Sequence, residues 1–416
     1  MIMLEIVMAT FTLYTLVKIY VSVMQIGYIS DKSKEDAVLL SPTKYKIAAK
    51  YAIYKERLSI IESTLEYILF LFWVFFGFQY LQKLTGIEDD LFSNLSFIFG
   101  FLIINYLVSL PLDIYKVFKL DKSFHFSTTT PKLYIQDQIK QAILFVIIGG
   151  VLFSALIYFI ERFSNWWLYS FLVIFSFIVL INMLYPTLIA PLFNKFKPLE
   201  DEELQKEIES ILKQVDLKSD GIFSIDASKR DNRLNAYFGG FGKAKRVVLF
   251  DTLLEKLSRS EIIAVLGHEL GHYSHKDIFK NIASMGVFLF LVFYIVGHLP
   301  NSLFLEMGVV PTAGVKIAFI MLILPIFSFI YMPIVGLISR HNEYEADKFG
   351  AKIGGKQNLI NALLKLVNEN KSFPYSHPLY IFFYYSHPPI INRLEALGYK
   401  EERRDDSVIL GFLDEH

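Results

Sequence analysis

Long hydrophobic runs alternate with polar segments along most of this chain. An α-helix rises 1.5 Å per residue, so about 20 consecutive apolar residues are needed to cross the hydrocarbon core of a membrane. About seven runs approach or exceed that length, and several contain Gly or Pro, which a packed helical bundle tolerates. The runs cover residues 2–25, 60–81, 91–110, 142–160, 166–185, 282–299 and 315–338. This pattern predicts a membrane all-α protein with about seven transmembrane helices.

The loops between these runs differ in their content of Lys and Arg. The first and third loops and the tail from residue 339 are basic, whereas the sixth loop, residues 300–314, has no Lys or Arg. Basic loops are retained on the cytoplasmic side of a membrane. We therefore expect the N-terminus outside, with the first, third and fifth loops and the C-terminal tail in the cytoplasm.

The fifth loop is a long polar insert with the pattern of a small α+β domain. Residues 199–217 predict an amphipathic helix, and residues 222–226 and 246–251 predict short strands. The turn-rich stretch 235–242 between the strands indicates an edge hairpin, whose free edge would bind an extended peptide by β-addition. Alternatively, Asn235 only caps a turn.

These patterns divide the chain into four regions. Residues 1–198 hold the first five spans, residues 199–280 form the insert, residues 281–338 hold spans six and seven, and residues 339–416 form a cytoplasmic C-terminal region. The first run contains Glu5 and Lys18 and lacks a small-residue cleavage site, so we do not expect a cleavable signal peptide.

The composition supports a membrane protein and excludes several classes of chemistry. Hydrophobic residues make up 54% of the chain and aromatic residues 16%, and the formal net charge is zero. The mean hydropathy of +0.42 is too high for a typical soluble protein. The balanced charge predicts no nucleic-acid partner. The absence of Cys excludes disulfides, a Cys nucleophile and thiolate ligands, so any zinc must be bound by His and carboxylate groups.

The most specific motif is His268-Glu269-Leu270-Gly271-His272. It lies in a predicted helix that begins at Ser258 or Ser260, where a hydroxyl can cap the first turn. Residues four apart share one face of a helix, so His268 and His272 can bind one metal ion while Glu269 acts as a general base on a bound water.

The same five residues have a purely structural interpretation. With nine His in the chain, the motif can occur by chance, and two His on a helix can be solvated or hydrogen-bonded to backbone carbonyls. Gly271 argues against this interpretation, because Gly inside a helix costs about 1 kcal/mol relative to Ala. A small residue there allows another backbone or a substrate to approach closely.

A third metal ligand is expected just after the seventh span, on the same side of the membrane. Glu343 is the candidate, Glu345 remains an alternative, and Asp347 would orient a ligating imidazole from the second coordination shell. The segment could also be an ordinary charged helix. In the tail, Pro388 and Pro389 predict a helix that begins at Ile390, with His387 just before it. A lone His before Pro is more often structural than catalytic.

Taken together, these stretches resemble the type I CAAX prenyl protease family of integral-membrane zinc endopeptidases. The resemblance covers about residues 51–397. Its markers are Leu110-Pro111-Leu112-Asp113-Ile114-Tyr115, Tyr185-Pro186, Ile189-Ala190-Pro191-Leu192-Phe193-Asn194, Asn235-Ala236-Tyr237, the His268–His272 motif, Arg340, Glu343, Asp347 and the block 386–397.

The resemblance implies a site. It assigns zinc ligation, one ion per chain, to His268, His272 and Glu343, and the catalytic base to Glu269. It places His387, Asn235 and Tyr237 at the substrate, with His387 also catalytic, and Arg340 and Asp347 in the second shell. It further implies a ring of seven helices around a hydrophilic intramembrane chamber, capped by a zincin-like domain.

The resemblance also implies a function, which is hydrolysis of peptide bonds near the C-terminus of (iso)prenylated CAAX-type substrates by zinc-activated water. Two alternatives remain. One is a membrane-protein quality-control protease with the same chemistry, and the other is a seven-span metal-sensing receptor or transporter. The segments 120–126 and His275-Lys276-Asp277 depart from the family pattern, and we expect neither to touch a ligand. The compact chain suggests a prokaryotic plasma membrane.

Overall fold

The computed structural model describes residues 2–86, 88–217, 219–240 and 245–400. Within these ranges, seven helical segments are long and apolar enough to cross a membrane, which confirms the predicted number. In chain order, they contain α1 (Ile2–Lys32); α2 (Pro42–Phe72) continuing into α3 (Phe78–Thr85); α4 (Leu91–Tyr115) continuing into α5 (Asp121–Ser123); α6 (Pro131–Arg162); α7 (Trp166–Leu184) continuing into α8 (Ala190–Phe193); α12 (Asp277–Gly297); and α14 (Ala313–Gly354). π-Helical turns join α2 to α3, α4 to α5 and α7 to α8.

These helices are longer than the hydrophobic runs that predicted them. The first loop, expected from residue 27 to residue 59, is mostly helical, because α1 extends to Lys32 and α2 already begins at Pro42. Proline suits the first turn of a helix, where a backbone N–H has no partner in any case. Hydropathy locates only the part of a helix that lies in hydrocarbon, so the polar ends were missed.

Aromatic residues hold the transmembrane helices together. Phe11 of α1 stacks on Phe70 of α2 with ring centroids 3.9 Å apart, and Trp73 is completely buried beside Phe101 of α4. The same hydrophobic cluster includes residues of α12 and α14. Many apolar side chains on the outer surfaces of the helices are exposed, as expected for helices that face lipid rather than water.

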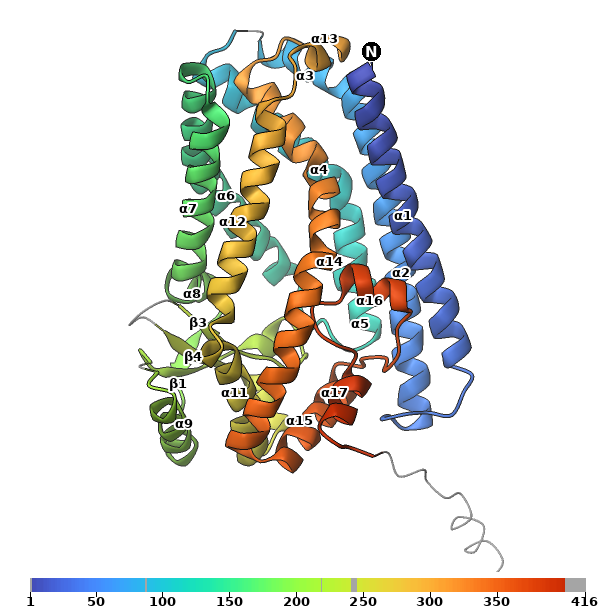
Figure 1. Ribbon diagram of the computed structural model, residues 1–416, viewed down its shortest axis with the longest axis vertical. Coiled ribbons are helices and arrows are strands. Elements are labelled where there is room, and N and C mark those ends of the chain that lie inside the picture. Colours follow the sequence, from blue (N-terminus) through green and yellow to red (C-terminus); the bar gives the residue numbers. More distant parts are fainter. Residues whose placement is uncertain (1, 87, 218, 241–244, 401–416) are drawn as a thin grey trace, which may run out of the picture.

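The polar insert and the three residues before it form a four-stranded sheet at one end of the helices (Figure 1). Its strands are β1 (Phe196–Pro198), β2 (Ile222–Ile225), β3 (Ala236–Gly239) and β4 (Arg246–Phe250), in the order β1-β2-β4-β3. The central pair β2–β4 is parallel and the outer pairs are antiparallel. β3 is therefore an edge strand, as expected; Phe241 and Gly242 of the proposed hairpin lie outside the described residues.

Further helices pack on this sheet or on the helices next to it. They are α9 (Glu202–Gln214), α10 (Asp251–Lys256), α11 (Arg259–Ser274), α15 (Lys356–Glu369), α16 (Pro378–Tyr384) and α17 (Ile390–Ala396); the short α13 (Ser302–Glu306) lies at the other end of the molecule (Figure 1). Leu204 and Ile208 of α9 and Leu266 of α11 pack with Val247 of β4 in one core.

The long helix α14 joins the membrane region to the insert. It runs through the expected division between residues 338 and 339 without a break, and Thr312 caps its N-terminus. In Figure 1, α14 passes from the membrane part of the molecule to the level of α11. The seventh span and the segment with Glu343 are therefore one element, so the boundary expected at 338/339 does not separate two structural units.

Candidate metal centre

Helix α11 begins at a capping box that decides between the two candidate Ser residues. The backbone N–H of Ser258 donates to the Glu261 carboxylate at 2.7 Å, and the Ser258 hydroxyl accepts from the Glu261 N–H at 3.4 Å. This reciprocal arrangement satisfies two backbone donors that a helix start leaves unpaired. Lys365 of α15 neutralises the buried Glu261 carboxylate at 2.7 Å.

α11 crosses α14 so closely that only Gly fits at several positions. A Cβ atom on Gly271 would lie 2.8 Å from the Cα of Ala346, and one on Gly350 would lie 2.8 Å from the backbone nitrogen of His268. The close approach expected at Gly271 is confirmed, and the approaching element is the backbone of α14. This crossing sets the distance between the histidines of α11 and the carboxylates of α14.

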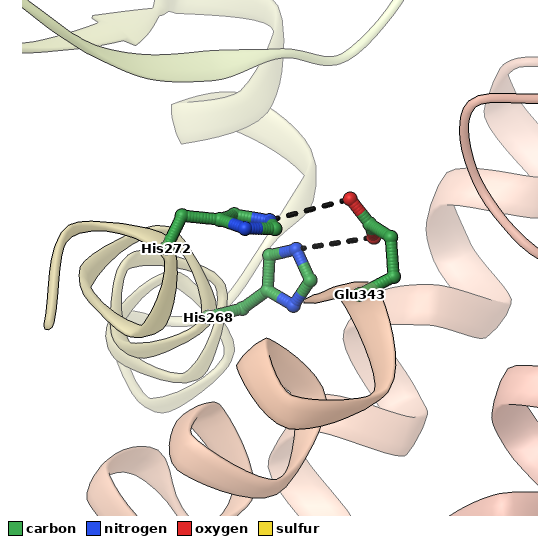
Figure 2. A group of neighbouring side chains, drawn as sticks. All are labelled: His268, His272 and Glu343. Atoms are coloured by element: carbon green, nitrogen blue, oxygen red, sulfur yellow. Dashed lines mark ion pairs between the residues drawn. The ribbon is translucent and has the colours of Figure 1, made fainter. Parts of the chain in front are cut away.

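His268 and His272 of α11 face Glu343 of α14 (Figure 2). Each residue offers one ligand atom, and these atoms lie within 4.8 Å of one another. The Nε2 of His268 is 3.5 Å from Oε2 of Glu343, and the Nε2 of His272 is 3.2 Å from Oε1. Two imidazole nitrogens and one carboxylate are the ligand set of many catalytic zinc sites.

The burial and hydrogen bonding of the Glu343 carboxylate are those expected of a metal ligand. Its Oε2 is buried and forms no hydrogen bond within the described structure, although Nη1 of Arg393 lies 3.2 Å away. A buried carboxylate oxygen without a hydrogen bond is costly unless a cation completes its surroundings. Glu345, the alternative ligand, instead pairs with Lys348 at 2.7 Å on the surface.

Each of the two imidazoles that could bind a metal is held through its other nitrogen by a carboxylate. Nδ1 of His268 lies 2.8 Å from Oδ1 of Asp347, and Nδ1 of His272 lies 3.0 Å from Oδ2 of Asp277. Such a carboxylate keeps the proton on Nδ1 and leaves the Nε2 lone pair for a metal. The expected place of Asp347 beside a ligand is therefore seen in its contacts.

Two residues that contact the imidazoles or their carboxylates were not predicted from the sequence. Asp277 begins α12 and lies in the segment that we expected not to touch a ligand, which is wrong because it binds His272. Arg393 of α17 is 8% exposed and holds Asp347 at 2.6 and 2.8 Å. The only local signal for Asp277 was its position five residues after His272. Arg393 lies 50 residues beyond Glu343, and its sequence neighbours do not indicate the contact.

The charges of the site shift the proton affinities of its bases. Burial lowers the pKa of His272, but the hydrogen bonds that its ring N–H groups donate to Glu343 and Asp277 outweigh burial and raise that pKa to about 9. Burial raises the pKa of Glu269 above its usual range, against the opposite effect of His268 and His272. In the metal-free site His272 is thus protonated at neutral pH, and metal binding must release that proton.

Glu269 and His272 both line a cavity of about 270 Å³. The cavity is lined mainly by apolar groups of β3, α11 and the start of α12. The residues that line the cavity are Leu217, Phe238, Gly239, Gly240, Lys245, Glu269, His272, Tyr273, Ile278 and Phe279. A carboxylate at a cavity beside a metal site can exchange protons with a molecule bound there.

The other predicted site residues differ in whether they contact the His–His–Glu cluster. Nε2 of His387 lies 3.1 Å from Oε1 of Glu343, so His387 belongs to the cluster. Asn235 is exposed, and its side chain accepts from the adjacent Ala236 N–H. Tyr237 packs with Phe250 and Val248, whereas its neighbour Phe238 lines the cavity beside Glu269. The described contacts therefore bring Phe238, which was not predicted, closer to the site than Tyr237.

Within the described part of the chain, no hydrogen bond or ion pair joins Arg340 to the proposed ligands or to the carboxylates that hold them. Its Nη1 donates to the backbone carbonyls of Ile381 and Tyr385 instead. These contacts differ from the place in the second coordination shell that we expected for Arg340. Glu56 of α2 accepts from the Tyr380 hydroxyl at 2.6 Å, and Gln25 of α1 bonds to the segment just before α16. Three transmembrane helices thus hold α16, which directly precedes His387.

Two protein-family models match this chain, one over most of its N-terminal half and one over most of its C-terminal half. The model of peptidase family M48 matches residues 198–401, and the model described as CAAX prenyl protease N-terminal, five membrane helices, matches residues 31–195. The CAAX prenyl protease 1 homolog of Arabidopsis thaliana is 31% identical over 390 residues, covering 88% of this chain and 90% of that protein. CAAX prenyl protease 1 of Saccharomyces cerevisiae is 37% identical over 319 residues, covering 72% and 70%.

A solved structure shows the same fold. The crystal structure of S. mikatae Ste24p superposes with a TM-score of 0.87 at 30% identity, covering 95% of this chain and 99% of that one. The seven membrane helices, the small sheet and the His–His–Glu cluster all agree with this assignment. The chain therefore belongs to the CAAX prenyl protease 1 family within peptidase family M48 and is a multi-pass membrane metallopeptidase.

Proposed function

We propose that this protein hydrolyses peptide bonds near the C-terminus of prenylated CAAX-type substrates, with one zinc ion held by His268, His272 and Glu343. The observation that carries the proposal is the convergence of these three side chains next to Glu269 and its cavity. The protease family excludes the receptor or transporter alternative. The relatives' names supply the substrate class, since they are CAAX prenyl proteases.

The chemistry follows from the positions of these groups. Bound zinc would supply a Lewis acid that polarises the scissile carbonyl and lowers the pKa of a water to about 7. Glu269 is positioned to take a proton from an attacking water and to return it to the departing amine. Asp347 and Asp277 keep the two imidazoles oriented, and Arg393 balances the charge of Asp347 and Glu343.

The edge strand β3 supplies a place for the substrate backbone. Its outer edge is free of a neighbouring strand in the described sheet, and Phe238 and Gly239 border the cavity at Glu269. An extended peptide added to β3 would lie along this cavity. We assign Tyr237 of β3, and Asn235 directly before it, to binding of the substrate rather than to the reacting groups.

The cell topology is part of the proposal. The charge pattern of the loops supports an N-terminus outside and a metal centre on the cytoplasmic side. A prokaryotic plasma membrane remains a prediction, and the relatives compared above are eukaryotic. The intramembrane chamber also remains a prediction.

Cleavage of a farnesylated CAAX peptide, compared with its unprenylated twin, tests the substrate class. We expect the purified protein in detergent to cleave the farnesylated peptide at least tenfold faster, because the prenyl chain adds apolar area to binding. Mass spectrometry of the products locates the cut bond. Equal rates on both peptides would contradict the prenyl requirement and favour membrane-protein quality control with the same chemistry.

His387→Ala should slow peptide cleavage by about 10²-fold, because a donor to the developing oxyanion is worth that much in comparable sites. The geometric support is the 3.1 Å distance from its Nε2 to Oε1 of Glu343, which brings the ring beside the proposed metal ligands. Metal content should not change. His341→Ala, an exposed residue of α14, is the matched control. An unchanged kcat in His387→Ala would remove this residue from the mechanism.

A further inference from the structure

A basic cavity lies where α1 ends and α2 begins, away from the metal centre. It measures about 250 Å³ and is lined by Ser33, Lys46, Ala49, Lys50, Ile53, Tyr54 and Arg57. We propose that this α1–α2 basic cavity binds the phosphate-bearing headgroup of an anionic membrane lipid. The proposal does not depend on the substrate of the protease.

The cations of the cavity lack the partners that their neighbours have. Lys32 pairs with Glu35 at 2.9 Å, and Lys34 pairs with Asp31 at 2.8 Å. Within the described part of the chain, no ion pair involves Lys46, Lys50 or Arg57. Their positive charge is therefore available to an external anion.

A single aromatic ring brings two of these cations together. The Lys50 ammonium lies 5.7 Å from the centroid of the Tyr54 ring, and the Arg57 guanidinium lies 5.8 Å from it. Cation–π contacts of this kind orient a cation without neutralising its charge. The arrangement presents an ammonium and a guanidinium to one site, which suits the several oxygens of a phosphate group.

The spacing of the residues makes the cavity part of one helix face. Positions 46, 50, 53 or 54, and 57 follow one another at intervals of three or four residues, and Lys46 and Arg57 are about 16 Å apart along the axis of α2. The small, buried Ala49 lies between Lys46 and Lys50 and leaves the hollow open. A longer side chain at this position would fill it.

The same face continues into the membrane, which favours a lipid over a soluble phosphate. The hydrophobic run of α2 begins at residue 60, about one turn after Arg57. Ile61 and Ile68, four and eleven residues beyond Arg57, are large apolar side chains that remain exposed. A lipid whose phosphate is bound at the cations would lay its acyl chain along these residues.

The cavity also lies close to the junction between the membrane helices and the C-terminal region. The joined ends of α1 and α2 are at the same end of the molecule as α15 and α17 (Figure 1). Ile29 of α1 and Tyr45 of α2 share a buried cluster with Val367 and Phe373. A lipid bound at the cavity would thus stabilise the helix pair against which the residues after α15 pack.

Native mass spectrometry of the delipidated full chain, titrated with phosphatidylglycerol, tests the proposal. We expect one tightly bound phosphatidylglycerol per chain and at least tenfold weaker binding of phosphatidylcholine. The variant Lys46→Gln/Lys50→Gln/Arg57→Gln should bind phosphatidylglycerol about a hundredfold more weakly, since each basic residue near an anionic headgroup contributes a factor of about five. The single change Lys50→Gln should weaken binding about fivefold.

The matched control is Lys44→Gln/Lys55→Gln/Lys132→Gln, which removes three exposed cations outside the cavity. If this control loses as much affinity as the cavity variant, nonspecific attraction explains the binding and the proposal is wrong. Equal binding of phosphatidylcholine would also overturn it. If glycerol 1-phosphate binds as tightly as phosphatidylglycerol, the ligand is a soluble phosphate and the lipid assignment fails. Unchanged metal content and peptide cleavage in detergent establish that both variants are folded.

Discussion

Glu269→Gln should abolish peptide cleavage, with kcat reduced by at least about 10³-fold, while the metal stays bound. The glutamine has nearly the same shape but cannot accept a proton from the attacking water, and loss of a general base typically costs 10²–10⁴-fold. Glu269 is not one of the three converging ligands, so the metal content should remain at one ion per chain. A fluorogenic peptide assay and elemental analysis of the same preparation measure both quantities.

The control for this experiment is Glu255→Gln, which removes an exposed carboxylate from α10 of the same domain. It should leave both the rate and the metal content unchanged. Two results would contradict the role of Glu269. Retained cleavage would show that another group accepts the proton, and loss of metal would show that Glu269 is itself a ligand.

Glu343→Gln should weaken zinc binding by more than about a hundredfold and abolish cleavage with it. Changes to residues that only support a ligand already cost 10–100-fold in affinity, so loss of a ligating carboxylate should cost more. The amide is a poor zinc ligand and removes the negative charge at the centre of the cluster. Competition with a chelator of known affinity, followed by elemental analysis, measures the change.

Glu345→Gln is a close control, because it alters the same residue type two positions away on α14. Glu345 pairs with Lys348 at the surface and makes no described contact with the cluster. Its variant should bind zinc and cleave peptide as the unmodified protein does. Equal zinc affinity in Glu343→Gln and the unmodified protein, or loss of zinc in Glu345→Gln, would overturn the assignment of the third ligand.

The sequence by itself determined the features that depend on neighbouring residues. The hydrophobic runs predicted the number and order of the membrane helices, because each polar residue adds its own free-energy cost when it is transferred into hydrocarbon. The four-residue spacing of His268 and His272 predicted a shared helix face, because helical geometry is local. The edge position of β3 and the helix start at Ile390 were likewise confirmed.

Only the tertiary structure decided which distant residues complete the site. Glu343 and Glu345 differ little in their sequence surroundings, and the crossing of α11 over α14 at Gly271 and Gly350 turns one toward the histidines and the other toward water. The same applies to Asp277 and Arg393, which hold the ligand layer. Arg340 lies on the same helix as Glu343, yet its described hydrogen bonds go to the residues before His387. Contacts between distant segments depend on how whole helices pack, and the residue types at a contact do not by themselves predict that packing.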